Sequence, residues 1–310
     1  MAKRIMVSVL GPAPTAESLT GAAAVEFMQK FWQEQYAQLQ GHCPDLIVLP
    51  ECSDRFPALS TPERLEYYHF RGEQMLDFHR NHARANNCWI AYSAVRCLDD
   101  GSRRNSTYLL DRQGQVAGIY DKNYPVPDET YAQNILPGKD ICAVATELGT
   151  VGMVICFDLN YQELCERYAA VRPQLLLFSS MYHGGLMQNY WAYHCQSYFV
   201  GCVARGECTI ISPLGELIAR STNYFHYVSA EINLDYVIVH LDRNWQKLKA
   251  AKSKYGRGVS IIEPGKLGVV QLSSEMPERS ALEIIREFEI MPWDDYYAQA
   301  TAHRQQYLPQ

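Results

Sequence analysis

The sequence alternates between short apolar runs and longer segments in which apolar residues recur at helical spacing. The short runs predict strands at Arg4–Leu10, Asp45–Leu49, Cys88–Val95, Ser106–Leu110, Gln115–Tyr120, Thr150–Cys156, Gln174–Phe178 and Val200–Val203. The longer segments predict helices at Glu17–Gln40, Pro62–Asn86, Tyr161–Val171 and Leu186–Phe199. Strands that alternate with helices in this way are typical of an α/β protein whose buried sheets are covered by helices.

One region departs from this alternation. Asp100-Gly101 and Arg112-Gln113-Gly114 are turn sequences, and the strands around them follow one another without a helix. Antiparallel strands therefore join the sheet, and a purely parallel Rossmann pattern is disfavoured.

The pattern weakens after Glu275, so we expect one main domain over residues 1–275 and a C-terminal tail over residues 276–310. The tail carries large aromatic residues that need a cover, among them Trp293, Tyr296, Tyr297 and Tyr307. Packing on a neighbouring subunit and packing on the chain's own domain explain them equally well.

Composition narrows the classes of partner. The net charge is −6 and the chain has no Lys- or Arg-rich run, so we expect no nucleic-acid partner. No run of ~18 apolar residues occurs, and the basic and apolar N-terminus fits a first strand better than a signal peptide. We therefore expect a cytoplasmic protein with no membrane partner.

The chain contains 10 cysteines, but their positions lack the compact spacing of a disulfide framework, so we expect reduced thiols. The pair His79 and His82 is the nearest approach to a metal motif, and it lacks the further ligands that a zinc site needs. We expect no metal and no organic cofactor.

Cys156 ends an apolar run and precedes polar residues. Such a cysteine is usually an inert part of the core. However, Asn160 and Glu163 form a capping-box pattern, which predicts that Cys156 lies in a strand-to-helix turn near the positive end of a helix. In that setting the thiolate is favoured and backbone N–H groups face a substrate.

Two other segments carry candidate groups. Glu51 follows the run Leu46–Leu49 and Pro50, where a buried strand delivers a carboxylate to the edge of an α/β sheet. Lys122 follows a strand, and a proline-rich loop returns Glu129 seven residues later. Taken alone, each of these residues is most simply explained as a solvated surface charge.

Taken in order, the three segments resemble the nitrilase superfamily of carbon-nitrogen hydrolases. Leu-Pro-Glu51 is similar to its glutamate motif, Tyr-Asp-Lys122 to its lysine motif, and Ile-Cys156-Phe-Asp to its cysteine motif. The resemblance covers residues 4–245 and implies a four-layer α-β-β-α sandwich, with Glu51, Lys122 and Cys156 as the catalytic triad. It places the family's additional glutamate on Glu129 rather than on the shorter Asp128.

The resemblance also implies the roles. Cys156 is the nucleophile, Glu51 is the general base, and Lys122 with the backbone N–H of Phe157 stabilises the oxyanion. Tyr182 borders the substrate pocket in this resemblance, although packing is an equally good explanation for it. The implied reaction is hydrolysis of a small-molecule amide through a cysteine thioester, with release of ammonia or an amine.

Several alternatives stay open. A Cys–His enzyme that pairs Cys156 with His183 or His194 is conceivable, whereas a serine hydrolase lacks its Gly-x-Ser-x-Gly motif. Phe157-Asp158 resembles amidase branches more than true nitrilases, so N-carbamoyl and nitrile hydrolysis are the secondary hypotheses. A catalytically silent scaffold on the same fold is a further one.

The chain departs from the family pattern at residues 204–207, where it is shorter than usual, and this weakens substrate analogies. The resemblance and the aromatic tail together predict a homo-oligomer, a dimer or larger.

Overall fold

The computed structural model describes residues 3–15, 19–263 and 267–309. The chain divides into two compact units, one formed by Met6–Glu231 and the other by the N-terminal residues through Ile5 with the segment from Ile232 onward. The division into a hydrolase domain over residues 1–275 and a tail over residues 276–310 stays a prediction, because compactness alone does not say which residues the reaction requires.

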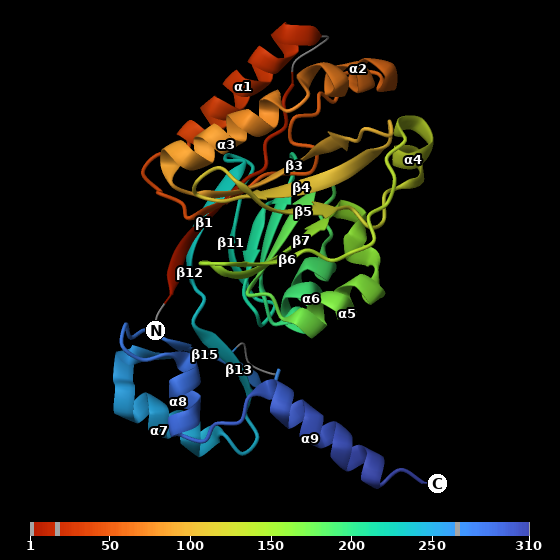
Figure 1. The fold of residues 1–310 in the computed structure, drawn as a ribbon. Helices are drawn as coiled ribbons and strands as arrows, with labels where there is room; N and C mark the ends of the chain where they lie inside the picture. Colours follow the sequence, from red (N-terminus) through yellow and green to blue (C-terminus); the bar gives the residue numbers. More distant parts are fainter. Residues whose placement is uncertain (1–2, 16–18, 264–266, 310) are drawn as a thin grey trace. The chain divides into compact units, whose positions relative to one another are not determined.

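Two six-stranded sheets form the centre of the larger unit (Figure 1). The first sheet has the order β12 (Tyr227–Asn233), β1 (Arg4–Leu10), β2 (Leu46–Val48), β3 (Trp89–Cys97), β4 (Arg103–Leu110) and β5 (Val116–Asp121). The second has the order β11 (Leu217–Arg220), β10 (Thr209–Ile211), β9 (Tyr198–Val203), β8 (Leu175–Ser180), β7 (Gly149–Ile155) and β6 (Ala143–Thr146).

Each sheet combines parallel central strands with antiparallel strands. In the first sheet β1, β2 and β3 are parallel, and β4 and β5 join as an antiparallel hairpin. In the second sheet β7, β8 and β9 are parallel, whereas β6, β10 and β11 pair antiparallel. The prediction of a mixed sheet is therefore confirmed.

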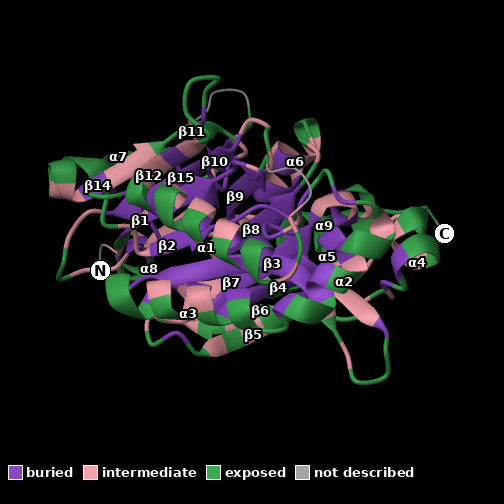
Figure 2. Cartoon of the chain, turned by 90° about the horizontal axis from the view of Figure 1, so that it is seen from above, coloured by how far each residue is buried: buried purple, intermediate pink, exposed green. Residues whose placement is uncertain are grey.

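Helices cover the outer face of both sheets (Figure 1). Over the first sheet lie α1 (Gly21–Ala37), α2 (Thr61–Arg71) and α3 (Gln74–Asn86), whereas α5 (Gln162–Val171) and α6 (Leu186–Cys195) cover the second. The inner faces of the sheets meet, since the Ser179 hydroxyl in β8 donates to the carbonyl oxygen of Leu49 after β2 at 2.8 Å. The central strands are buried, and the outward sides of the helices are exposed (Figure 2). The expected α-β-β-α sandwich is confirmed.

Some predicted element bounds are wrong. The helix expected over Pro62–Asn86 is two helices, because Gly72 takes a positive φ of 47° that ends α2. The helix expected over Leu186–Phe199 ends at Cys195, and Tyr198 already belongs to the buried strand β9. The helix expected from Glu17 begins at Gly21 within the described residues, and Glu17 itself lies outside them.

The smaller unit has a three-stranded antiparallel sheet of β13 (Tyr236–His240), β15 (Val269–Ser274) and β14 (Val259–Ile262). Its helices are α7 (Trp245–Tyr255), α8 (Ala281–Glu287) and α9 (Trp293–Gln306). In the expected tail, α8 buries Ala281, Ile284 and Ile285 in the core of this unit. Trp293 and Tyr296 stack on His240 of the same unit, whereas Tyr297 stays 62% exposed.

Candidate active site

Glu51 lies just past β2 and is 4% exposed. Its Oε1 accepts hydrogen bonds from Lys122 Nζ and Asn105 Nδ2, both at 2.8 Å. Its Oε2 accepts from the backbone N–H of Met181 at 3.1 Å. Both oxygens of the carboxylate are therefore oriented by buried or partly buried donors.

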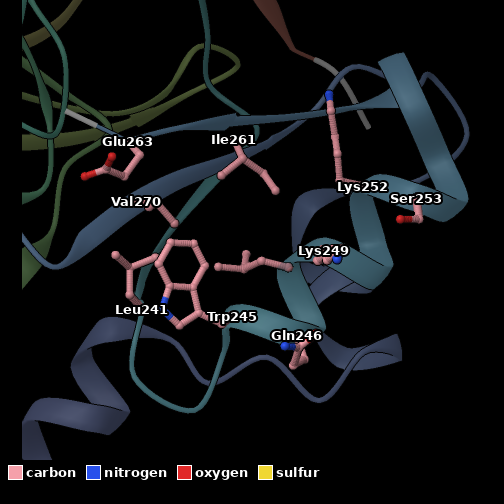
Figure 3. Close-up of a pocket in the computed structure, with 10 residues that line it drawn as sticks. Leu241, Trp245, Gln246, Lys249, Lys252, Ser253, Ile261, Glu263 and Val270 are labelled. Carbon is pink, nitrogen blue, oxygen red and sulfur yellow. The ribbon is translucent and has the colours of Figure 1, made fainter. Parts of the chain in front are cut away.

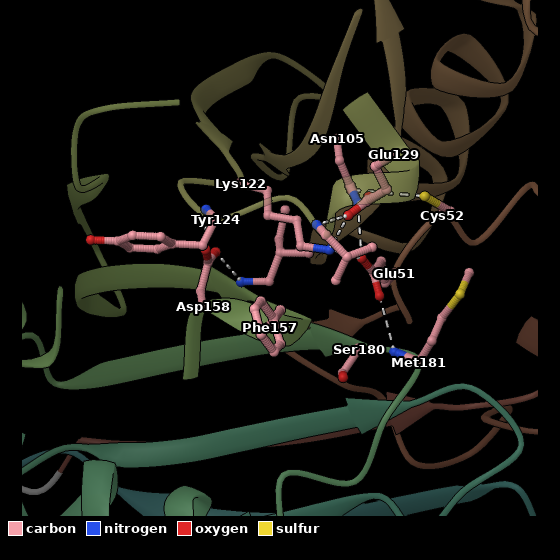
Figure 4. A network of polar contacts seen from close by, with 12 residues as sticks. Glu51, Cys52, Asn105, Lys122, Tyr124, Glu129, Phe157, Asp158, Ser180 and Met181 are labelled. Atoms are coloured by element: carbon pink, nitrogen blue, oxygen red, sulfur yellow. Dashed lines mark hydrogen bonds and ion pairs between the residues drawn. The ribbon is translucent and has the colours of Figure 1, made fainter. Parts of the chain in front are cut away.

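Lys122 follows β5 and is 2% exposed. Its side chain points toward the carboxylates of Glu51 and Glu129 (Figure 4). Its Nζ donates to Glu51 Oε1 and to Glu129 Oε2, each at 2.8 Å. Burial alone lowers the pKa of a lysine, but the two carboxylates outweigh burial and hold the pKa of Lys122 above its usual value. Lys122 is therefore a fixed ammonium group.

Glu129 lies in the first turn of α4 (Pro127–Gln133), a short helix within the predicted proline-rich loop. Its carboxylate accepts from the Val126 backbone N–H and from Asn105 Nδ2, both at 2.8 Å, in addition to Lys122. Asp128, the alternative carboxylate, is exposed at the start of the same helix. The carboxylate that faces Lys122 is thus the one on Glu129.

Cys156 begins the short 3₁₀ helix η1 (Cys156–Asn160) directly after β7, with a left-handed φ of 50°. Its thiol is partly buried and lies against the Glu51 carboxylate, the Lys122 ammonium and the Met181 backbone. Burial, followed by the negative charge of Glu51, raises the pKa of Cys156 to about 12, against the opposing effect of Lys122. The expectation that this position favours the thiolate is therefore wrong, and the resting group is a thiol.

The expected capping box is also wrong. Asn160 is the last residue of η1, and its Nδ2 donates to the Phe157 carbonyl oxygen and to the Tyr182 hydroxyl, both at 3.1 Å. The following helix α5 starts after Tyr161 and has no side-chain cap. Cys156 was expected to lie near the positively polarised N-terminus of α5, but the five residues of η1 separate the two in the sequence.

The two expected substrate-binding residues lie close to Cys156. Phe157 is the next residue and packs edge-on against Tyr161. Burial, followed by the proximity of the Cys156 sulfur, raises the pKa of Tyr182 to about 12. Their roles in binding stay proposals, since each also has a packing partner.

The histidines considered for a Cys–His pair have other partners. His183 Nε2 lies 3.7 Å from Glu207, and His194 Nε2 lies 3.1 Å from Glu166. His79 shares a buried hydrogen bond with Tyr36. Within the described ranges, no group of three or more potential ligands is arranged to hold a metal ion.

Two buried residues of the site have no role assigned from the sequence. Asn105, at 1% exposed, bridges Glu51 and Glu129. Asp158 is fully buried and accepts from the Tyr120 hydroxyl at 2.7 Å, the Tyr124 backbone N–H at 2.8 Å and the Ile155 backbone N–H at 3.1 Å. Because Tyr120 and Tyr124 flank Lys122, Asp158 joins the lysine segment to the cysteine turn.

A cavity of about 220 Å³ adjoins the cluster and is lined by Glu51 and Met181 among others. A larger cavity of about 790 Å³ lies in the smaller unit, where Trp245, Lys249 and Val270 line it (Figure 3). The larger cavity contains none of the candidate catalytic residues, whereas Glu51 lines the smaller one, which is therefore the candidate substrate pocket. Lys122 and Cys156 are not among the residues that line it.

Comparisons with known proteins show the family to which the chain belongs. The sequence profile of the family described as carbon-nitrogen hydrolase matches residues 28–239. Over 217 residues the chain is 30% identical to omega-amidase NIT2-A of Xenopus laevis, covering 62% of this chain and 78% of that relative. Over 223 residues it is 24% identical to the nitrilase and fragile histidine triad fusion protein NitFhit of Drosophila melanogaster, covering 64% of this chain and 48%, about half, of that relative.

Among solved structures, Saccharomyces cerevisiae Nit3, described as a member of branch 10 of the nitrilase superfamily, aligns with a TM-score of 0.62. The alignment has 18% identity and covers 74% of this chain and 90% of that one. The four-layer sandwich is thus the fold of the nitrilase superfamily. The chain belongs to the carbon-nitrogen hydrolase family, in an amidase-like branch, and is a hydrolase.

Proposed function

We propose that this protein hydrolyses the carbon–nitrogen bond of a small-molecule amide through a cysteine thioester and releases ammonia or an amine. The observation that carries the proposal is the single cluster in which Glu51, Lys122 and Glu129 are hydrogen-bonded beside the Cys156 thiol. The relatives named as amidases support the same reaction class.

The first step starts from the neutral thiol. As sulfur forms a bond to the amide carbonyl carbon, Glu51 accepts the thiol proton and the carbonyl π electrons move to oxygen. Lys122 and the Phe157 backbone N–H stabilise this oxyanion, an effect of about 3 kcal/mol per well-placed donor. Because burial and the Glu51 charge raise the pKa of Cys156, we expect proton transfer to Glu51 to accompany the attack.

The later steps return every group to its starting state. Glu51 gives its proton to the amide nitrogen, the carbon–nitrogen bond breaks, and ammonia or an amine leaves a thioester on Cys156. Glu51 then takes a proton from water as the water oxygen attacks the thioester. Collapse of that adduct breaks the carbon–sulfur bond and releases the acid, and Glu51 returns its proton to the sulfur, which restores the thiol and the carboxylate. Glu129 and Asn105 keep Glu51 and Lys122 in position.

N-carbamoyl and nitrile substrates are the alternatives within the same active site. A screen for ammonia release over amides, N-carbamoyl amino acids and nitriles separates them, with Cys156→Ala as the inactive variant and Cys97→Ala, an exposed thiol, as the matched control. We expect amides to be the best substrates and intact-protein mass spectrometry to detect the acyl adduct. Equal turnover by Cys156→Ala would refute the nucleophile, and the absence of turnover with every compound would favour the silent scaffold.

We also propose a cytoplasmic homo-oligomer. No helix in the described part of the chain is long and apolar enough to span a bilayer. A monomer in sedimentation at micromolar concentration would contradict the oligomer.

A further inference from the structure

Two thiols that the proposed reaction does not use lie next to each other at the end of β9. Cys202 belongs to β9, and Cys208 immediately precedes β10. These strands are antiparallel, with Thr209 opposite Gly201. Continuing this register by one residue places Cys208 opposite Cys202, with both side chains on the same face of the sheet. The two thiols are hydrogen-bonded to each other, and neither is in a disulfide.

The position of the pair meets the geometric requirement of a disulfide. Opposite residues of an antiparallel pair have Cα atoms about 4.5–5.5 Å apart, and a disulfide joins residues whose Cα atoms are about 4.4–6.8 Å apart. The Leu10 carbonyl oxygen accepts from Cys202 Sγ at 3.1 Å, and the Val203 backbone N–H donates to Cys208 Sγ at 3.4 Å. A bond between the sulfurs therefore requires rotation of the two side chains rather than movement of the strands.

Both thiols are fully buried, directly behind the wall of the candidate substrate pocket. The loop 204–207 joins the two cysteines, and Arg205 in this loop lines the pocket. On the other side, a Cβ at Gly11 would lie 2.4 Å from Cys208 Sγ, and the next residue, Pro12, also lines the pocket. Local opening of this short loop, without unfolding of the sheet, therefore admits a molecule as small as hydrogen peroxide.

The two thiols differ in acidity. The hydrogen bond shared with Cys202, against the opposing effect of burial, lowers the pKa of Cys208. Burial, followed by the same hydrogen bond, raises the pKa of Cys202. Cys208 is therefore the thiol that reacts first, and Cys202 is placed to attack its oxidised form.

We propose that Cys202 and Cys208 form a reversible disulfide in the presence of a hydroperoxide, and that this bond fixes the loop 204–207 in the wall of the pocket. With hydrogen peroxide, the Cys208 sulfur attacks one oxygen, the O–O bond breaks, and the other oxygen leaves as water with the thiol proton. The product is a sulfenic acid on Cys208. The Cys202 sulfur then attacks that sulfur, and the sulfenic oxygen leaves as water with the second thiol proton. Two thiols are thus oxidised to one disulfide, and one peroxide is reduced to two waters.

The first test maps the disulfide in the intact wild-type protein after treatment with hydrogen peroxide. The remaining thiols are blocked with N-ethylmaleimide during denaturation, and the tryptic peptides are analysed by mass spectrometry. Because trypsin cleaves after Arg205, the disulfide should join two peptides that separate on reduction with dithiothreitol.

A second pair of thiols in the same unit is the internal control. Cys165 and Cys195 are also hydrogen-bonded to each other, but they lie in the hydrophobic core between α5 and α6. We expect this pair to stay reduced at peroxide concentrations that oxidise Cys202 and Cys208. Equal oxidation of both pairs, or oxidation of neither, overturns the proposal.

Single substitutions test the order of the two steps. In Cys202→Ser we expect Cys208 to accumulate as a sulfenic acid that dimedone labels, because the second thiol is missing. Cys208→Ser should give neither the disulfide nor a label on Cys202. Cys97→Ser, at an exposed thiol, is the matched control and should keep the disulfide. Labelling of Cys202 in Cys208→Ser would overturn the assigned order.

The constraint on the loop is measured with and without catalysis. The bond closes a loop of about seven residues, so we expect the equilibrium constant of urea unfolding to fall roughly 50-fold on oxidation. Hydrogen exchange of residues 203–207 should slow in the same sample, and Cys208→Ser should show neither effect. A complete disulfide without slower exchange overturns the constraint.

A change in the KM for an amide, reversed by dithiothreitol, is the further expected effect, and this part rests on the proposed function. If the disulfide and the slower exchange occur and no amide is hydrolysed, the thiol pair stands and the proposed function fails. If amides are hydrolysed and the disulfide forms without a change in KM, the proposed function stands and the effect of the loop on the pocket fails.

Discussion

Two turns of this protein have the same local pattern and different environments. Cys52-Ser53-Asp54 follows β2, and Cys156-Phe157-Asp158 follows β7. Both cysteines take a left-handed backbone, with φ of 46° and 50°, and both aspartates are fully buried.

The difference lies in what surrounds the two turns. Asp54 pairs with the Arg71 guanidinium at 2.5 Å, and Cys52 is 6% exposed with its thiol toward Asn105. The donors to Asp158 are instead a hydroxyl and two backbone N–H groups, and Cys156 is more open to solvent. The same backbone thus supports a closed structural turn in one place and a candidate reactive turn in the other.

The largest difference is expected in turnover. Cys156→Ala should lower amide hydrolysis at least about 10⁴-fold, because no other group can form the thioester. Cys52→Ala should keep turnover within about 10-fold of the wild type and cost about 1 kcal/mol of stability through the lost core contacts. Ammonia release and chemical unfolding measure the two effects. Similar losses of turnover in both variants would show that the turns do not differ in function.

The next effect concerns stability. Asp54→Asn leaves the Arg71 guanidinium buried without its charge partner, so we expect a loss of about 3 kcal/mol in the free energy of unfolding. Glu73→Gln is the surface control, because Glu73 is 74% exposed and lies 3.6 Å from Arg80. It should change stability by less than about 0.5 kcal/mol in urea unfolding. Equal effects would mean that the buried pair is not what fixes the first turn.

The contrast between the turns also shows what the sequence can and cannot predict. The strands up to β9, except the edge strand β6, and the α/β class follow from hydrophobic periodicity, because central strands are apolar throughout and helices alternate with them. Glu51, Lys122 and Cys156 lie far apart in the sequence, and each was ambiguous until the order of the three motifs was considered. Their contacts with Asn105 and Met181 arise from the packing of two sheets, which no local pattern encodes.

The errors have physical causes as well. Gly72 and Gln196 end helices through left-handed backbones that periodicity does not detect. The thiolate expectation failed because a sequence does not show how much burial and the Glu51 charge raise the pKa of Cys156. The sequence also does not show that Cys52 and Cys156 differ in burial and in the groups around them.

The raised pKa of Cys156 predicts unusual alkylation. Since its pKa is about 12, the thiolate fraction, and hence the rate of reaction with iodoacetamide, should rise about 100-fold between pH 8 and pH 10. A free thiol with a pKa of ~8.5 gains only about 4-fold over that interval. Cys52, which is nearly inaccessible in the folded protein, should stay unlabelled. Residue-specific mass spectrometry follows each site, and a plateau for Cys156 below pH 9 would contradict this account.

The smallest expected effect concerns Asp158. Burial raises its pKa to about 6, so its carboxylate is ionised above that pH and its two oxygens can accept all three hydrogen bonds. Below pH 6 one oxygen carries a proton that competes with an N–H donor, and the Lys122 segment loosens from the Cys156 turn. We therefore expect kcat to fall on the acid side with a midpoint near 6, with little change in KM.

Asp158→Asn has one acceptor oxygen at every pH, so kcat should be about 10-fold lower and the acidic limb should be absent. Tyr120→Phe keeps the carboxylate but removes the hydroxyl donor that lowers its pKa, so the limb should move to higher pH. A pH profile of kcat for the three proteins decides between positioning and simple packing. If Asp158→Asn keeps the same acidic limb as the wild type, another group titrates near pH 6. Asp158 would then only stabilise the turn at Cys156, as Asp54 stabilises the turn at Cys52.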